Sequence, residues 1–232
     1  MDGLLLIDKP KGWTSFDIVK KIRGLSGVRK VGHSGTLDPL ATGLLIVALG
    51  KATKLLTGLI GCDKEYEVVA CFGAVSDTYD AEGKISVVEG GSFDDCTEDS
   101  IRKIISENFL GEIEQIPPQY SAVKVGGRKA YDIARGGGSV ELKPRKIRVD
   151  SFDIVDFKLE PLQRQKFLLV KFLIKCGSGT YVRSLVHDLG KMLGCGAYVE
   201  ELRRIKVGKF NVDKAVQITD LLSGNIEQSL FF

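Results

Sequence analysis

The chain has 232 residues, 44% of them hydrophobic and 27% charged, a composition typical of a folded globular protein with a real core. Its apolar runs, such as residues 44–49, are far shorter than the roughly 18 residues of a membrane helix, and its start lacks the features of a secretion signal. Its net charge of +3 divides into +5 over residues 1–60, −9 over residues 61–100 and +7 over residues 101–232. We therefore expect a cytoplasmic protein without a membrane partner, and its basic parts fit either a polyanion partner or an ordinary mixed-charge surface.

In chain order, the first third alternates short buried strands with one helix. Apolar runs predict strands at residues 4–8, 44–49 and 66–72. Between the first two strands, Thr14 or Ser15 is suited to cap a helix. Apolar side chains then recur at helical spacing at Ile18, Val19, Ile22 and Leu25. Residues 32–43 have no clear period and are predicted to form a loop.

The rest of the chain is predicted to contain four helices and one β-hairpin. Two β-rich stretches, residues 146–157 and 167–176, are separated by a polar segment, as in a hairpin. Helices are expected after the cap residue Thr97, at residues 128–135, after Thr180 and at residues 198–204. We predict an α+β (mixed α/β) protein with a largely antiparallel central sheet flanked by helices, in one domain over residues 1–232.

The cysteines and histidines are too scattered to predict a metal site. There are five cysteines and two histidines, and no C-x-x-C pair. Zinc sites need clustered ligands, so we expect no metal and free thiols, as in a reducing compartment.

The densest group of chemically capable residues is the loop G-H-S-G-T-L-D-P-L-A-T-G at residues 32–43. Pro39 moves Asp38 toward an extended conformation, so its carboxylate can project from a rigid loop. An Asp-Pro pair that only starts a turn is the alternative. A serine-hydrolase elbow with Ser34 and His187 is disfavoured, because G-H-S-G is one residue short of G-x-S-x-G. No phosphate-loop motif is present.

With the residues that follow it, this loop resembles the signature of the TruB family of tRNA pseudouridine-55 synthases. Six further blocks resemble family motifs in the same order along the chain, so the resemblance covers residues 4 to about 210. They are D-K-P-K-G-W-T-S at 8–15, D-K-E-Y at 63–66, Q-I-P-P-Q-Y-S-A at 115–122 with Lys124, G-R-K-A-Y at 127–131 through Arg135, G-T-Y-V-R at 179–183 and L-R-R at 202–204.

The resemblance implies roles for eight residues. Asp38 matches the catalytic aspartate, Tyr66 the tyrosine that stacks on the target base, and Arg183 the arginine that pairs with the aspartate. His33, Tyr181 and Leu202 match residues that line the nucleotide pocket. Lys9 and Pro10 match residues that support the active-site loop. The Lys and Arg residues of 128–148 and 203–209 would contact phosphates.

The implied fold is that of a pseudouridine synthase, and the implied reaction is isomerisation of uridine in the T stem-loop of tRNA, by a monomer without a cofactor. Bacterial members usually carry a C-terminal RNA-binding PUA domain, and none is seen in residues 1–232. Two alternatives remain: a guide-RNA-directed synthase of the dyskerin type, and a non-catalytic RNA-binding protein or tRNA chaperone. Leu40-Ala41 after Pro39 resembles the stand-alone enzymes.

Overall fold

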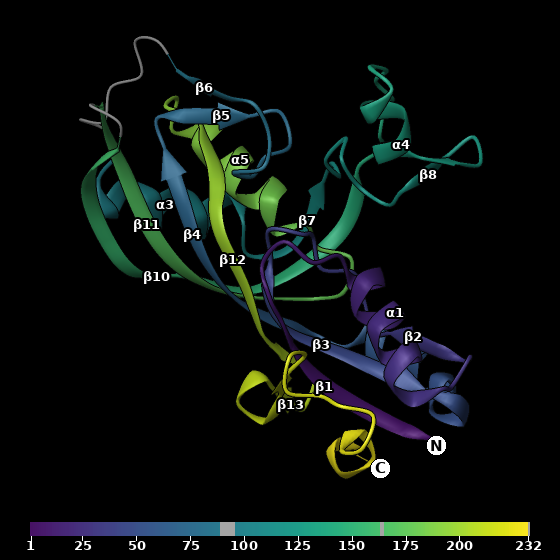
Figure 1. The fold of residues 1–232 in the computed structure, drawn as a ribbon. Coiled ribbons are helices and arrows are strands. Elements are labelled where there is room, and N and C mark those ends of the chain that lie inside the picture. The colour runs from purple at the N-terminus through teal and green to yellow at the C-terminus, as the bar shows by residue number, and fades with distance from the viewer. Residues whose placement is uncertain (89–95, 163–164, 232) are drawn as a thin grey trace. The chain divides into compact units, whose positions relative to one another are not determined.

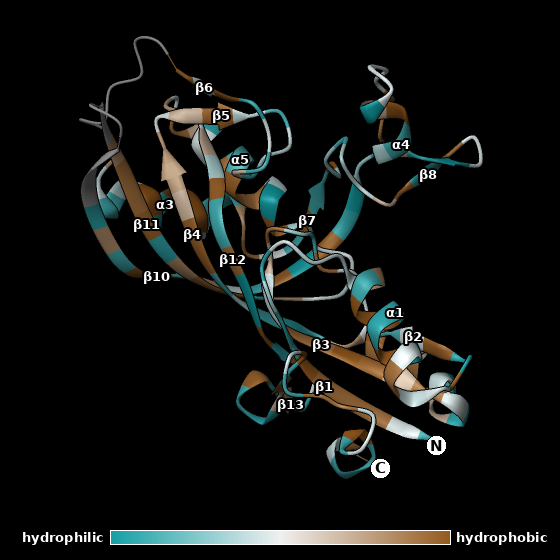
Figure 2. Cartoon of the chain, in the orientation of Figure 1, coloured by the Kyte–Doolittle hydropathy of each residue, from teal (hydrophilic) through white to brown (hydrophobic). Residues whose placement is uncertain are grey.

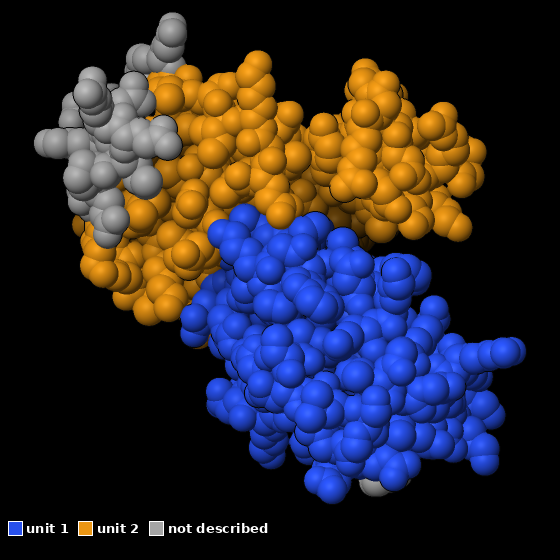
Figure 3. All heavy atoms as spheres, viewed as in Figure 1, with its two compact units in different colours: residues 1–67, 202–232 blue, residues 68–201 orange. Residues whose placement is uncertain are grey.

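The structure is a computed structural model that describes residues 1–88, 96–162 and 165–231 (Figure 1). It divides into two compact units (Figure 3). Unit 1 comprises residues 1–67 and 202–232, and unit 2 comprises residues 68–201. Two strands, β4 (Lys64–Phe72) and β12 (Ala197–Val207), have residues in both units.

Unit 1 is built on a sheet with the strand order β14–β1–β3–β12, in which β2 also pairs with β3 and β13 with β12. The β1–β3 and β2–β3 pairs are antiparallel, and the β1–β14 and β3–β12 pairs are parallel. Its other elements are β1 (Gly3–Lys9), α1 (Ser15–Ser26), β2 (Val31–His33), β3 (Thr42–Leu49), η1 (Gly50–Leu55), α2 (Leu56–Gly61), β13 (Phe210–Asn211), η2 (Val212–Lys214), β14 (Val216–Gln217) and η3 (Ile226–Ser229).

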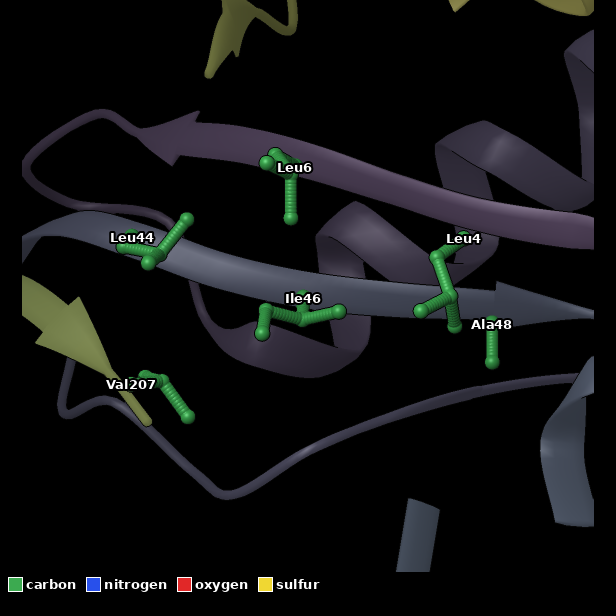
Figure 4. Close-up of a cluster of buried hydrophobic side chains, with 6 residues drawn as sticks. All are labelled: Leu4, Leu6, Leu44, Ile46, Ala48 and Val207. Carbon is green, nitrogen blue, oxygen red and sulfur yellow. The ribbon is translucent and has the colours of Figure 1, made fainter. Parts of the chain in front are cut away.

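The core of unit 1 lies on the strands β1 and β3, which are hydrophobic along most of their length (Figure 2). One cluster of buried side chains comprises Leu4, Leu6, Leu44, Ile46, Ala48 and Val207 (Figure 4). The neighbours Leu5 and Leu45, which point to the opposite face of the strands, are also fully buried. Both faces of this sheet are therefore covered, which explains the unbroken apolar runs in the sequence.

Helix α1 begins and ends where its capping residues allow. Thr14 forms a capping box with Asp17: its hydroxyl accepts from the Asp17 N–H at 3.0 Å, and the Asp17 carboxylate accepts from the Thr14 N–H at 2.9 Å. Gly27 ends the helix at a φ of +67°, and its N–H donates to Arg23. The predicted cap at Thr14 is confirmed.

Unit 2 contains a second group of strands in the order β4–β11–β10–β7. The β10–β11 and β10–β7 pairs are antiparallel, and the predicted hairpin is confirmed as β10–β11. The elements are β5 (Ala74–Ser76), β6 (Ile85–Val87), α3 (Glu98–Asn108), β7 (Gly111–Gln115), β8 (Lys124–Val125), β9 (Arg128–Lys129), α4 (Ala130–Arg135), β10 (Arg145–Leu162), β11 (Gln165–Cys176) and α5 (Val182–Met192).

The predicted fold class is confirmed: the chain is α+β, its strand pairs are mostly antiparallel, and helices accompany them. One predicted element is wrong. Residues 198–204 were expected to be helical and instead lie in β12, where Arg203 pairs with Thr42 of β3 and Lys206 with Asn211 of β13. Pairing with distant strands decides the conformation there, and local propensity does not. Among the described residues, no helix is both long and apolar enough to span a membrane.

Candidate active site

Asp38 lies on the loop between β2 and β3 of unit 1 and is half-buried. The loop is a tight turn at this point, because the Asp38 carbonyl accepts from the N–H of Ala41 at 3.1 Å. The Pro39 that follows restricts Asp38 to extended conformations. The Asp38 carboxylate is thus carried by a short turn whose backbone is restricted by Pro39 and by the hydrogen bond to Ala41.

Lys9 holds this loop from the end of β1. Its side chain is fully buried, and its ammonium donates to the carbonyls of Trp13 at 2.6 Å, Pro10 at 2.9 Å and Pro39 at 3.3 Å. The N–H of Gly12 donates to the same Pro39 carbonyl at 2.8 Å. The predicted supporting residue Lys9 therefore contacts the Asp38 loop, and Pro10 is joined to the loop through the Lys9 ammonium.

Ser15, the first residue of α1, ties the helix to the same loop. Its buried hydroxyl accepts from the Leu37 N–H at 2.8 Å and lies 3.1 Å from the Leu37 carbonyl, to which it donates. The residue before Asp38 is thereby fixed to the helix that Thr14 caps. This contact explains the serine in the D-K-P-K-G-W-T-S block.

Arg204 holds both ends of the loop from β12. Its side chain is buried, and it donates to the carbonyl of Gly35 at 3.2 Å and to that of Leu44 at 2.8 Å. Gly43 has a φ of +95°, and a Cβ on it would lie 2.3 Å from the carbonyl oxygen of Arg204, so only glycine fits there. Sequence reasoning missed this role of Arg204.

The expectation that residues 203–209 contact phosphates is corrected for Arg204, since a buried guanidinium is not available to an RNA surface. Its neighbour Arg203 pairs with Asp8 at 2.7 Å, and Lys206 pairs with Glu65 at 3.0 Å. Arg203 and Lys206 are thereby engaged in ion pairs with carboxylates of unit 1.

The predicted pocket residues of unit 1 are mostly covered. Tyr66 on β4 and Leu202 on β12 are buried, and His33 at the end of β2 is half-buried. The His33 Nδ1 accepts from the Gly35 N–H at 3.3 Å. Burial lowers the pKa of His33, and the Arg204 guanidinium lowers it further, so the imidazole is neutral at neutral pH.

Arg183 lies in unit 2, on the first turn of α5, and is buried. It forms a buried ion pair with Asp80 at 3.1 Å, and donates to the carbonyls of Thr78 at 2.7 Å and Tyr120 at 2.9 Å. Sequence reasoning missed Asp80, which lies in an acidic segment of the sequence. The pairing of Arg183 with Asp38 stays a prediction.

The turn that carries Asp80 is itself fixed to α5. Tyr79 has a φ of +63°, a conformation rare for a residue with a large side chain. Its ring stacks on His187 of α5, with 3.7 Å between the ring centres, and its carbonyl accepts from the Val199 N–H at 3.0 Å. Helix α5 therefore supplies Arg183 and also holds the turn that bears its partner.

Tyr181 precedes α5 and is held through its backbone. The buried Gln115 side chain accepts from the Tyr181 N–H at 2.8 Å and donates to the Tyr181 carbonyl at 3.0 Å. The Tyr181 ring packs at the edge of the cluster of Val123, Ala130 and Leu142. Across residues 1–88, 96–162 and 165–231, no three His, Cys, Asp or Glu side chains are placed to hold a metal ion.

Comparison with solved structures supports the fold assignment. A chain from the crystal structure of a Cbf5–Nop10–Gar1 complex aligns over 94% of this chain and 53% of its own length, with a TM-score of 0.69 and 32% identity. A chain from an archaeal box H/ACA sRNP Nop10–Cbf5 complex aligns over 98% and 57%, with a TM-score of 0.66 and 28% identity.

Comparison with family models identifies the class. Residues 23–182 match the N-terminal domain of the TruB family pseudouridylate synthases, and residues 183–229 match the C-terminal domain of tRNA pseudouridylate synthase B. The chain therefore falls in the class of the pseudouridylate synthases. Such an enzyme is an isomerase, because uridine and pseudouridine contain the same atoms.

The curated relatives agree and narrow the class. The tRNA pseudouridine synthase B of Aquifex aeolicus is 46% identical over 96% of this chain and 74% of its own length. That of Chlamydia abortus is 45% identical over 93% of this chain and 86% of its own length. That of Bifidobacterium longum is 42% identical over 90% of this chain and 63% of its own length. The chain belongs to the TruB family, and the resemblance found in its sequence is confirmed.

Proposed function

We propose that the chain converts the uridine at position 55, in the T loop of tRNA, to pseudouridine, with Asp38 as the catalytic carboxylate. The observation that carries this proposal is the construction of the Asp38 loop. Two fully buried cations, Lys9 and Arg204, and the buried hydroxyl of Ser15 hold the backbone on both sides of one half-buried carboxylate. Such preorganisation is what a positioned nucleophile requires.

The reaction needs a carboxylate and a pocket that excludes water. The N1–C1′ bond of uridine breaks, the base rotates and a C5–C1′ bond forms. The C5 hydrogen leaves as a proton, and N1 takes up a proton. Asp38 can act by attack on the sugar or the base, or by assisting formation of a glycal intermediate. Reactant and product are isomers, so no redox cofactor or energy source enters the balance.

Arg183 is proposed as the partner of Asp38. A guanidinium beside a carboxylate favours its charged form and fixes its orientation. Arg183 has five N–H donors, and Asp80 with two carbonyls holds the group in one orientation. Asp80 is thus a positioning residue that acts through Arg183.

The target base must leave the RNA stack, which costs a few kcal/mol. In this proposal, stacking on Tyr66 offsets part of that cost, since base–aromatic stacking is worth about 1–3 kcal/mol. Neutral His33, Tyr181 and Leu202 line the remainder of the pocket. The substrate is the T stem-loop of tRNA, and the acting form is a cytoplasmic monomer.

Stand-alone action on tRNA is favoured over the guide-RNA alternative by sequence similarity. The relatives named tRNA pseudouridine synthase B are 41–46% identical, whereas the Cbf5 chains are 28–32% identical. A non-catalytic RNA-binding protein is disfavoured, because binding a polyanion does not require a carboxylate on a loop whose backbone is held by buried cations.

The test is release of tritium from an unmodified tRNA transcript labelled at uridine C5. Wild type should release about one equivalent per tRNA, because the C5 hydrogen leaves in the reaction. Asp38→Asn should release none, and the matched variant Asp77→Asn, at an exposed turn residue, should behave as wild type. No release by wild type with RNA binding intact would reject stand-alone catalysis.

A second measurement addresses the substrate. We expect an isolated T stem-loop to react nearly as well as full tRNA, because the contacts predicted for this chain are with the T stem-loop. The measurement is kcat/KM for both RNAs in the tritium assay. A large preference for full tRNA would contradict the T stem-loop as the main recognition element.

A further inference from the structure

An open groove of about 580 Å³ lies along α1 in unit 1. Pockets of roughly 300–1,000 Å³ hold drug-sized ligands, so there is room for one nucleotide. The lining combines an indole, two exposed ammonium groups and apolar surface: Trp13, Lys20, Lys21 and Leu25, with Gly12 and Gly24 leaving the floor open. An aromatic face beside lysines is the combination that binds a nucleobase and its phosphate.

The charge around the groove favours a polyanion. Residues 9–30 contain seven Lys or Arg and one acidic residue, Asp17. The Asp17 carboxylate accepts from the N–H and the hydroxyl of Thr14, at 2.9 and 2.6 Å, so it is engaged in capping α1. Lys20 and Lys21 are exposed on the groove wall. An unstacked, negatively charged nucleotide is complementary to this surface.

The groove is connected to the Asp38 loop within unit 1. Gly12, at one end of the groove, donates its N–H to Pro39 at 2.8 Å, and the Trp13 carbonyl accepts from Lys9, which also donates to Pro39. The groove therefore adjoins the loop that carries Asp38, as a subsite for a nucleotide near the target uridine requires.

We propose that this groove is a second nucleotide subsite, which binds one unstacked nucleotide of the RNA substrate other than the target uridine. The base stacks on the Trp13 indole, and the phosphates lie between the ammonium groups of Lys20 and Lys21. The proposal rests on the proposed function, because RNA is the substrate in both.

Trp13 is the only tryptophan of the chain, so its fluorescence reports on the groove directly. The Asp38→Asn chain is titrated with a T stem-loop RNA that carries unpaired nucleotides at both ends, and with an oligouridylate. Stacking of a base should quench the Trp13 emission at the RNA concentration that also raises anisotropy of a labelled RNA. Heparin, a polyanion without bases, should bind without that quenching.

Matched variants separate stacking from charge. Trp13→Ala should weaken RNA affinity roughly 5- to 150-fold, the range that base stacking contributes, and Trp13→Phe should restore most of it. Phe16→Ala, at an exposed aromatic of α1 outside the groove, should change nothing. Lys20→Glu and Lys21→Glu should each weaken affinity about tenfold at low salt and reduce the salt slope by about one, unlike Lys103→Glu on α3.

Each outcome decides the proposal. Quenching by RNA that shifts about tenfold to higher RNA concentration in Lys20→Glu supports it. Absence of quenching on RNA binding, equal quenching by heparin, or equal weakening by Lys103→Glu overturns it. Tritium release by the wild-type chain is measured in parallel: release without quenching rejects the groove and keeps the proposed function, whereas quenching without release rejects the function and keeps the groove.

Discussion

The two units bury cations in different ways. In unit 1, Lys9 donates to the backbone carbonyl of Pro39, and Arg204 donates to those of Gly35 and Leu44. In unit 2, Arg183 has a carboxylate partner, Asp80, as well as carbonyls. Carbonyl ligands fix the course of a backbone, whereas a carboxylate fixes the guanidinium itself. Unit 1 therefore positions a loop, and unit 2 positions a side chain.

This difference predicts different costs when each arrangement is altered. Removing one partner of a buried ion pair leaves an uncompensated charge, and the cost is large. Removing a buried cation from carbonyls leaves acceptors without donors but also removes a charge that was costly to bury. We therefore expect the larger loss in unit 2.

Asp80→Asn should have the largest effect, because it leaves Arg183 buried beside a neutral group. We expect a loss of about 3–5 kcal/mol in the free energy of unfolding, measured by urea denaturation. Misplacement of the guanidinium should also lower kcat, by up to about 100-fold, with RNA affinity retained. Asp77→Asn, in the same turn but exposed, is the control. A wild-type kcat in Asp80→Asn would reject a positioning role for Asp80.

Arg204→Met should follow, with a loss of about 2–3 kcal/mol, because two buried carbonyls lose donors. The Asp38 loop should loosen, so kcat should fall while RNA affinity changes little. Arg204→Lys keeps the charge but has only one nitrogen, and should be intermediate. Urea denaturation and single-turnover rates measure both effects. If Arg204→Met retains both stability and rate, the loop does not depend on this cation.

Much of the secondary structure and the Asp38 loop could be predicted from the sequence, but the contact partners of Asp80 and Arg204 could not. The apolar runs at residues 4–8 and 44–49 predicted β1 and β3, because both faces of those strands are buried. Thr14 and Thr97 predicted helix starts, because capping is local. Asp38 was recognised through its resemblance to a family motif.

What the sequence could not provide was set by contacts between distant residues. Residues 198–204 were predicted as helix because their apolar spacing is ambiguous over seven residues, and pairing with β3 and β4 makes them a strand. Asp80 and Arg204 carried no local signal, since each gains its role from a partner more than a hundred residues away. The predicted pairing of Asp38 with Arg183 remains to be tested.

Thr14→Ala and Thr97→Ala should have equal effects on stability and unequal effects on catalysis. Each removes the side-chain acceptor of a capping box, on α1 and on α3, and should cost about 1 kcal/mol. Helix α1 contacts the Asp38 loop through Ser15, whereas α3 belongs to unit 2. Thr14→Ala should therefore lower kcat and Thr97→Ala should not. Equal rates in the two variants would show that the loop does not depend on the start of α1.

The smallest expected effect concerns the two histidines, one in each unit. Burial lowers the pKa of both His33 and His187 below the usual 6.5. Just below pH 6.5 the histidines of the unfolded chain therefore bind more protons than those of the folded chain. The contribution of the two neutral histidines to the free energy of unfolding is full above pH 6.5 and is lost as the pH falls. Asp188, whose pKa is raised by burial, acts in the opposite direction at lower pH.

The cause of the shift at His33 distinguishes the units further. After burial, the charge of Arg204 also lowers the pKa of His33, whereas the charge of Lys191 also lowers the pKa of His187. Arg204→Met should raise the pKa of His33 and leave that of His187 unchanged, as followed by NMR titration of the imidazole Cε1–H signals. Arg204→Lys, which keeps the charge, should shift His33 less. Equal shifts at both histidines would indicate a general loosening of the fold, and the loop would then owe its rigidity to the whole of unit 1 instead of to one buried cation.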